Sequence, residues 1–307
     1  MLNLLWEMGP CLIVGALIGR WRPQWIAPLA TPLVRFGVPV SLMGLLLHGG
    51  LNGSLLGMAM LAVTVIAVML TLLRLATPFA AALSHPDLQL GSCIGNTAYF
   101  GVPAALALLP AEALPVSIGY DFGATLLAWG LGPLWLTRKQ ASNEQDRRWQ
   151  RLIGHLSASP ATRGLLGALI VMATPWHQAI SEALWLPSRA VIVLALAVVG
   201  MRLGSIASRN APRLDVSLTT PLICKLLLFP ALMLMVSLAL PLPGVARQAL
   251  VLQAAAPTAI SVLLMAESEQ LNAAASAQLI LRSTLLALIS VPLWSLLLRP
   301  LGGTPGM

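Results

Sequence analysis

The sequence predicts an all-α polytopic membrane protein, with ten transmembrane helices arranged as two inverted five-helix repeats. Composition is the first observation, because 58% of the 307 residues are hydrophobic and only 9% are charged. The second is a series of apolar runs, long enough to cross a bilayer as helices, that follow one another from end to end. The third is a motif near the end of the first half that returns near the end of the second. Lipid, and not water, is therefore the expected solvent of the fold.

Counting about 20 residues for each membrane crossing divides the chain into apolar segments. The ten segments lie at about 3–19, 26–48, 54–74, 88–109, 114–136, 163–181, 187–206, 216–240, 247–266 and 276–298. The first segment has no basic start and no small-residue cleavage site, so it is expected to be a retained helix and not a signal peptide. The one sizeable polar connection predicts a division into residues 1–136, a cytoplasmic linker at 137–162, and residues 163–307.

The basic residues predict the orientation of the chain. A formal charge of +8 could indicate nucleic acid, but the basic residues fall in the short connections between apolar segments, which is how orientation is encoded. If the central linker is cytoplasmic, the same side also receives a set of further arginines, Arg20, Arg22, Arg74, Arg209 and Arg213. Ten crossings then leave both termini outside. We expect a bacterial inner-membrane protein with periplasmic termini, and we expect no nucleic-acid partner.

A repeated motif relates the two halves. ATLLA at 124–128 followed by PLW at 133–135 returns as STLLA at 283–287 followed by PLW at 292–294, with the same spacing. Chance similarity is an alternative, because Leu and Ala are common here, but a shared Thr, Pro and Trp in register favour duplication. Five segments in each half would insert the second copy upside down. Inverted repeats are typical of secondary transporters, whose substrate site lies where the repeats meet.

One apolar segment in each half is interrupted by proline. GNTAYFGVP, residues 95–103, lies in the fourth segment, and AAAPTAIS, residues 254–261, lies in the ninth. Pro103 and Pro257 each remove a backbone donor and disfavour helix at the preceding residue, so we predict that both segments break there into half-helices. The alternative is that these prolines only kink packed helices. Unpaired backbone groups at membrane depth are tolerated where they are buried in protein or line a wet cavity, which predicts a substrate site at the two breaks.

Several motifs in order resemble the auxin efflux carrier family, the bacterial relatives of the plant PIN transporters. They are VPVSLMG at 38–44, GNTAYFGVP, YDFGATLLAWGLGPLW, KLLLFP at 225–230, APTAISVLLMAE and RSTLLALISVPLW, and they cover essentially the whole chain. The resemblance implies that the fourth and ninth helices cross at their prolines. It also implies a scaffold from helices 1, 2, 6 and 7 and a mobile transport domain from helices 3–5 and 8–10.

Family resemblance further implies a small organic carboxylate as substrate, such as auxin in plants or dicarboxylates such as malonate in some bacteria. Members often carry an amide near the ninth-helix crossover, whereas this chain has Thr258 and Ser261 around Ile260. Substrate identity is therefore left open. The protein could form a homodimer through its scaffold helices.

Three ionisable residues lie well inside apolar segments. Asp121 and Lys225 are expected at similar depths, so they could form an ion pair, either functional or structural. Arg35 lies about nine residues into the second segment. It could face the cavity and attract an anion, or it could pair with another group or extend to the interface.

Other chemistries lack the residues that they need. The three cysteines, Cys11, Cys93 and Cys224, stand singly in apolar surroundings, and the four histidines fall at segment ends or in connections, so no metal site or disulfide framework is predicted. No phosphate-binding G-x-x-x-x-G-K-[ST] motif occurs. We therefore predict neither an enzyme nor a cofactor. A membrane-embedded sensor or enzyme remains a weaker alternative.

The function expected from these features is secondary transport of a small mono- or dicarboxylate by elevator-like alternating access. A sodium-coupled symporter similar to the bile-acid carriers is the alternative within the same class. The residues expected to line the substrate path are Arg35, Met43, Asn96, Thr97, Tyr99, Gly101, Pro103, Pro257, Thr258 and Ser261.

Overall fold

The computed structural model consists of helices and their connections over the part of the chain that it describes. That part comprises residues 2–50, 53–75, 83, 85–136, 153–154, 157, 160–208, 217–271 and 274–301. The predicted linker at 137–162 lies largely outside the described residues. In the first half the helices are α1 (Leu2–Trp21), α2 (Ile26–Pro32), α3 (Val38–Gly49), α4 (Gly53–Leu75), α6 (Pro86–Gly91), α7 (Val102–Leu108) and α8 (Ala113–Leu136).

The second half has a similar series of helices. They are α10 (Pro160–Met172), α11 (His177–Ser208), α12 (Thr219–Ile223), α13 (Phe229–Ala239), α14 (Gly244–Ala255), α15 (Ile260–Ser268) and α16 (Ala274–Leu298). Short 3-10 turns lie at η1 (Pro23–Trp25) and η6 (Arg299–Leu301), and π turns lie at η2 (Leu33–Gly37), η3 (Thr97–Gly101) and η5 (Cys224–Leu228).

Five helical stretches of the described chain are long and apolar enough to cross a membrane. They are Pro23–Gly49, Gly53–Leu75, His177–Ser208, Thr219–Ala239 and Ala274–Leu301. Shorter apolar helices occur at Met8–Trp21, Thr97–Leu108 and Thr162–Met172. The all-helical class and the membrane character of the prediction are therefore confirmed. The count of ten crossings and their inverted arrangement remain predictions.

The predicted boundary between the sixth and seventh segments is wrong. We expected segments at 163–181 and 187–206, but α10 ends at Met172 and α11 runs from His177 through Pro187 to Ser208. The turn occurs at Thr174 and Pro175, where the Thr174 hydroxyl donates to the Val171 carbonyl oxygen at 2.7 Å. A residue before proline is disfavoured in the helix, which ends α10 early, whereas neighbouring structure tolerates Pro187 inside α11.

Two interrupted helices meet through their non-helical residues. Between α6 and η3, and between α14 and α15, the chain is extended enough for an antiparallel bridge that pairs Gly95 with Thr258. The Asn96 N–H donates to the Pro257 carbonyl oxygen at 2.7 Å, and the Ala259 N–H donates to the Ile94 carbonyl oxygen at 3.1 Å. Each interruption therefore satisfies backbone groups of the other, as a low-dielectric interior requires. We call this pairing, residues 94–96 with 257–259, the crossing.

Pro103 does not mark the first interruption, which corrects the prediction. The non-helical residues end at Asn96, and the helix then continues through η3 and Pro103 into α7. The reason lies in the π turn. Val102 donates its N–H to the Thr97 carbonyl five residues back, which widens the turn just before the proline ring.

A π turn also precedes two other prolines. Val38 donates to the Leu33 carbonyl before Pro39, and Phe229 donates to the Cys224 carbonyl before Pro230. A proline inside a helix lacks a donor and its ring meets the carbonyl four residues back, so a π turn lets the helix continue. Each of the three π turns therefore carries its helix past a proline instead of ending it.

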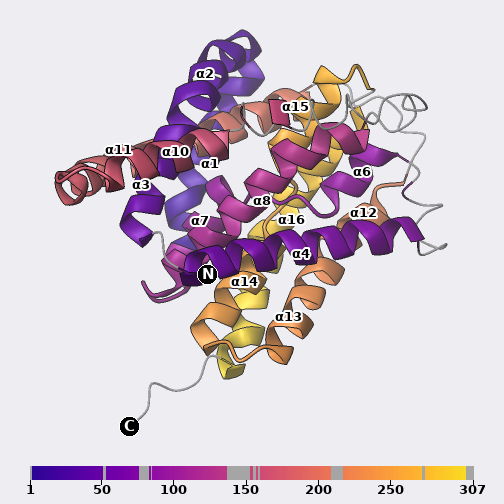
Figure 1. The fold of residues 1–307 in the computed structure, drawn as a ribbon. Helices are drawn as coiled ribbons and strands as arrows, with labels where there is room; N and C mark the ends of the chain where they lie inside the picture. Colours follow the sequence, from indigo (N-terminus) through magenta and orange to yellow (C-terminus); the bar gives the residue numbers. More distant parts are fainter. Residues whose placement is uncertain are drawn as a thin grey trace.

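Helix α11 joins α1 and α3 into one packed group, and α3 packs in turn on α10. In Figure 1, α11, α10, α3 and α2 lie together on one side of the molecule, while α12 and α13 lie on the other. A hydrophobic core unites α4, α6, α8, α13, α14 and α16 in the second group. These contacts resemble the predicted scaffold and transport domain, a division that stays a prediction.

Glycines let α1 and α11 approach closely. The space that a Cβ at Gly15 or Gly19 would take is filled by backbone of Ala197 and Met201, and Gly200 and Gly204 meet backbone of α1 in the same way. Both pairs have the small-xxx-small spacing that brings membrane helices together. Packing of these backbones, and not apolar burial alone, holds the two helices.

The repeated motif occupies equivalent places in two long helices. α8 carries ATLLA and Pro133, and α16 carries STLLA and Pro292. The Trp294 indole N–H donates to the Leu226 carbonyl oxygen at 2.9 Å, and the Trp135 indole N–H donates to the Gln89 side-chain oxygen at 3.1 Å. Pro230 removes the donor that would otherwise reach Leu226, so Trp294 takes its place.

The close approach of α1 and α11 generates a first prediction. Gly19→Ala should destabilise the protein by about 1–3 kcal/mol, because the added methyl group must displace the Met201 backbone. Gly9→Ala on the same helix is the matched control, since a Cβ there meets nothing within 4 Å. Thermal unfolding of the purified protein in detergent measures both. Equal stability of the two variants would mean that α1 and α11 do not pack as described.

Candidate functional site

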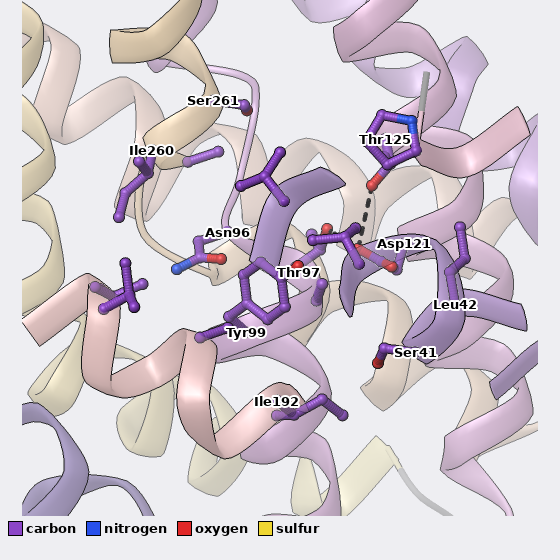
Figure 2. A pocket seen from close by; sticks show the side chains of 18 of the residues that line it. Ser41, Leu42, Asn96, Thr97, Tyr99, Asp121, Thr125, Ile192, Ile260 and Ser261 are labelled. Atoms are coloured by element: carbon purple, nitrogen blue, oxygen red, sulfur yellow. Dashed lines mark hydrogen bonds between the residues drawn. The ribbon is translucent and has the colours of Figure 1, made fainter. Parts of the chain in front are cut away.

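A cavity of about 130 Å³ lies beside the crossing. Its wall is formed by residues of α2, α3, the crossing, α8, α11 and α15. Its polar lining consists of Ser41, Asn96, Thr97, Tyr99, Asp121, Thr125, Arg202 and Ser261. Apolar residues including Leu42, Ile192 and Ile260 complete it, and Figure 2 shows the labelled side chains around the space.

Two helices begin at this cavity. The continuous helix of η3 and α7 starts at Thr97, and α15 starts at Ile260, and the first residues of both line the wall. N–H groups in the first turn of a helix have no acceptor within the helix, and they carry partial positive charge. Both helix starts therefore favour a negatively charged group in the cavity.

Asn96 keeps its side chain available to the cavity. Its backbone N–H pairs with Pro257, and its carbonyl oxygen accepts from Phe100 at 3.1 Å and Gly101 at 3.0 Å. These bonds use only the main chain, so they would survive a change of side chain. Asn96 is 8% exposed and lines the cavity beside Tyr99, whose buried hydroxyl has no hydrogen-bond partner.

Asp121 projects from α8 into the same wall and is held by two hydroxyl groups. The Thr97 hydroxyl donates to Asp121 Oδ1 at 2.5 Å, and the Thr125 hydroxyl reaches the same oxygen at 3.5 Å, the dashed line in Figure 2. The side chain is 2% exposed. One of its partners comes from the start of η3 and the other from the next turn of α8.

Lys225 is fully buried beside the crossing, where a Cβ added at Gly95 would lie 3.2 Å from its Nζ. Its Nζ donates to the Ala254 carbonyl oxygen at 2.7 Å and lies 4.8 Å from the centre of the Phe229 ring. Ala254 is in the last turn of α14, where the helix end carries partial negative charge. The ammonium group therefore stabilises the end of α14 where it enters the crossing.

The predicted ion pair between Asp121 and Lys225 does not form. The carboxylate accepts from Thr97 and Thr125, whereas the ammonium group donates to a backbone carbonyl. Similar depth along the membrane normal was the basis of that prediction, but the two groups bond to different partners. Depth alone does not fix the direction in which a helical side chain points.

Arg35 and Met43 are two predicted lining residues that the structure keeps out of the cavity. Arg35 is exposed, with its guanidinium carbon 5.3 Å from the centre of the Phe36 ring, although its neighbours Val34 and Val38 do line the wall. Met43 packs against Gly167 of α10. Neither lines the cavity, and a count of depth along the sequence could not reveal this.

Four further residues expected to line the path build the crossing or its surroundings. Gly101 leaves room for the amide of Gln253, and Pro257 accepts the bond from Asn96. Thr258 is 1% exposed and its hydroxyl donates to the Gly91 carbonyl oxygen at 2.8 Å, while its N–H donates to the Ser283 hydroxyl at 3.1 Å. Pro103 lines a separate cavity with Arg189 and Met8. Asn96, Thr97, Tyr99 and Ser261 do meet at the cavity.

Sequence reasoning missed several lining residues. Thr125 stands four residues after Asp121, which places both on one helix face, so this spacing was a usable signal. Ser41 and Trp129 carried no signal of their own. Arg202 lines both this cavity and a second one, which Glu267 and Ser205 also line. Among the described residues, no group of three His, Cys, Asp or Glu side chains is placed to hold a metal ion.

Two interrupted helices that meet beside a cavity are typical of membrane transporters. The family model described as membrane transport protein matches residues 139–295, and the chain belongs to this family. Its resemblance to the auxin efflux carriers is thereby confirmed. A protein of Methanothermobacter thermautotrophicus, described as an uncharacterized transporter, is 26% identical over 211 residues, or 69% of this chain and 67% of that protein.

The different surroundings of Thr258 and Ser261 generate a second prediction. Thr258→Val should destabilise the protein by about 1–3 kcal/mol, because it removes the buried donor to the Gly91 carbonyl. Ser261→Ala should leave unfolding nearly unchanged, because this hydroxyl faces the cavity. Thermal unfolding of both purified variants tests the contrast. The assignment of Thr258 to structure fails if Ser261→Ala is the more destabilising change.

Proposed function

We propose that the protein is a secondary transporter that moves a small mono- or dicarboxylate across the bacterial inner membrane. The single observation that carries the proposal is the cavity at the crossing, into which two helices begin. Such helix starts attract an anion through unpaired N–H groups. Asn96 and Tyr99 add polar groups that can orient the anion, and Ile260 and Leu42 limit its size.

Family membership supports a transport function, and the two helix starts at the cavity support an anionic substrate. Arg35 does not support an anionic substrate, because it is exposed and does not line the cavity. Arg202 takes its place as the cation at the wall, since it lines the cavity and continues into the neighbouring one. A carboxylate that passes Arg202 would therefore meet a positive group before it reaches the crossing.

In the proposed cycle, the group of α4, α6–α8 and α12–α16 moves past the group of α1–α3, α10 and α11. The cavity lies between residues of both groups, so such a movement would open it first to one side and then to the other. Ten crossings in two inverted repeats, with both termini periplasmic, complete the proposal.

Proteoliposomes loaded with unlabelled carboxylates test the proposal by exchange. Radiolabelled malonate, succinate and malate should exchange into vesicles that contain the protein and not into empty vesicles. Choline serves as a cationic comparison for substrate sign. Replacement of sodium by potassium in the buffer separates a sodium-coupled mechanism from one that needs no sodium. Exchange of choline without exchange of any acid would overturn the anion assignment.

The third prediction concerns Asn96. Asn96→Ala should weaken carboxylate binding by about tenfold to a hundredfold, the value of a hydrogen bond to a charged group. Thermal unfolding without substrate should barely change, because the crossing uses only the backbone of Asn96. Thr64→Val on the exposed face of α4 is the control, since that hydroxyl bonds only to the Met60 carbonyl of its own helix. A loss of thermal stability in Asn96→Ala would make the carboxamide a structural group.

A further inference from the structure

Asp121 places a carboxylate in a cavity whose helix starts favour an anion. Its side chain is 2% exposed and accepts hydrogen bonds from two hydroxyl groups, neither of which carries charge. No ion pair reaches it from the described residues that surround it. A lone buried carboxylate is unfavourable unless it is paired or protonated, so Asp121 is expected to have a function.

The charged and titratable groups on the elements that pack against α8 do not neutralise Asp121. Those elements are α3, α4, α6, η3, α7, α10, α14 and α15. Their groups, with those of α8 itself, are His48, Arg74, His85, Asp87, Tyr99, Tyr120, Arg163, Arg247, Glu267 and Glu269.

Most of these groups have contacts elsewhere. Arg74 lies over the Trp135 ring, His48 stacks on Trp185, and Arg247 donates to backbone carbonyls near the far end of α14. Asp87 accepts from the Ser276 hydroxyl at 2.6 Å. Tyr99 has a free hydroxyl at the same cavity. Arg202 of α11, which also lines the cavity, shares the neighbouring cavity with Glu267.

A bound carboxylate and an ionised Asp121 would repel each other in this confined space. Two carboxyl groups that share one site are stable when they share one proton, because a single O–H can bridge them. The Thr97 and Thr125 hydroxyl groups donate to the ionised carboxylate when the cavity is empty. Substrate and proton would therefore occupy the site together or not at all.

We propose that the protein couples transport to protons, with Asp121 as the group that carries the proton. This inference rests on the proposed function. On loading, Asp121 takes one proton from the aqueous phase and donates it as a hydrogen bond to a substrate carboxylate oxygen. On release at the opposite face, the substrate departs as the anion and the proton leaves Asp121 for water. The empty carrier returns with Asp121 ionised and held by the two threonines.

The fourth prediction is accumulation driven by a pH gradient. Vesicles with the membrane potential held at zero by valinomycin and equal potassium should accumulate radiolabelled malonate about tenfold per unit of pH, inside alkaline, because one proton accompanies one anion. Sodium is absent throughout. Exchange of malonate at equal pH on both sides is measured in the same vesicles and reports transport alone. Succinate or malate replaces malonate if it exchanges faster.

Variants assign the proton to its residue. At alkaline pH, malonate affinity of the wild-type protein should fall about tenfold per unit of pH, because each bound malonate needs one proton on Asp121. Asp121→Asn should remove this dependence, because an amide holds its protons at every pH, and it should abolish accumulation by the gradient. Asp87→Asn is the matched control. It is a buried aspartate bonded to a hydroxyl group but outside the cavity, and it should keep the pH dependence.

The outcomes distinguish failure of proton coupling from failure of carboxylate transport. Exchange without gradient-driven accumulation in the wild-type protein would overturn proton coupling and leave carboxylate transport standing. No exchange of any of the three acids would overturn both. If Asp121→Asn does not fold, proton uptake on malonate addition to wild-type protein in weak buffer replaces it. Uptake near one proton per bound malonate supports the proposal, and no uptake overturns it.

Discussion

Two backbone hydrogen bonds at the crossing are the constraint on which the rest of the structure depends. Membrane-embedded chain cannot leave helical conformation unless its N–H and C=O groups find partners. Here the partners come from a second interruption, since Asn96 pairs with Pro257 and Ala259 pairs with Ile94. Neither interruption could exist without the other. Thr258, Ser283 and Lys225 then fix the two strands of the crossing to α6, α14 and α16.

The cavity is a consequence of this pairing. A helix that restarts after an interruption presents its first turn, with unpaired donors, to whatever lies beside it. Both η3 and α15 start at the crossing, and their first residues line the same small cavity. The fold thus creates an electropositive region from backbone alone, and it places the carboxylate of Asp121 beside that region through a threonine at the start of η3.

Sequence patterns predicted the class of fold, the family and the two interrupted segments, because these depend on apolar length and on proline and glycine. They did not predict which side chains face the cavity. In a soluble protein one face of a helix is polar, which reveals its orientation. In a membrane the lipid and the protein core are both apolar, so rotation about the helix axis leaves little trace in the sequence. For this reason the predictions that Arg35 and Met43 line the cavity, and that Asp121 pairs with Lys225, were wrong. The prediction of a helix break at Pro103 was wrong because a π turn lets a helix continue past a proline.

The repeated motif places Thr125 on α8 and Thr284 on α16 at equivalent positions, but the two hydroxyl groups have different partners. Thr284 donates to the backbone carbonyl of Ile280, four residues back, whereas Thr125 reaches the side chain of Asp121 at the same offset. If the halves descend from one duplicated ancestor, the acid belongs to only one of them today. A dimeric ancestor of identical halves would have carried two acids or none. Fusion of two copies into one chain would permit a single acid, and with it two copies of one motif that serve unequal chemical roles.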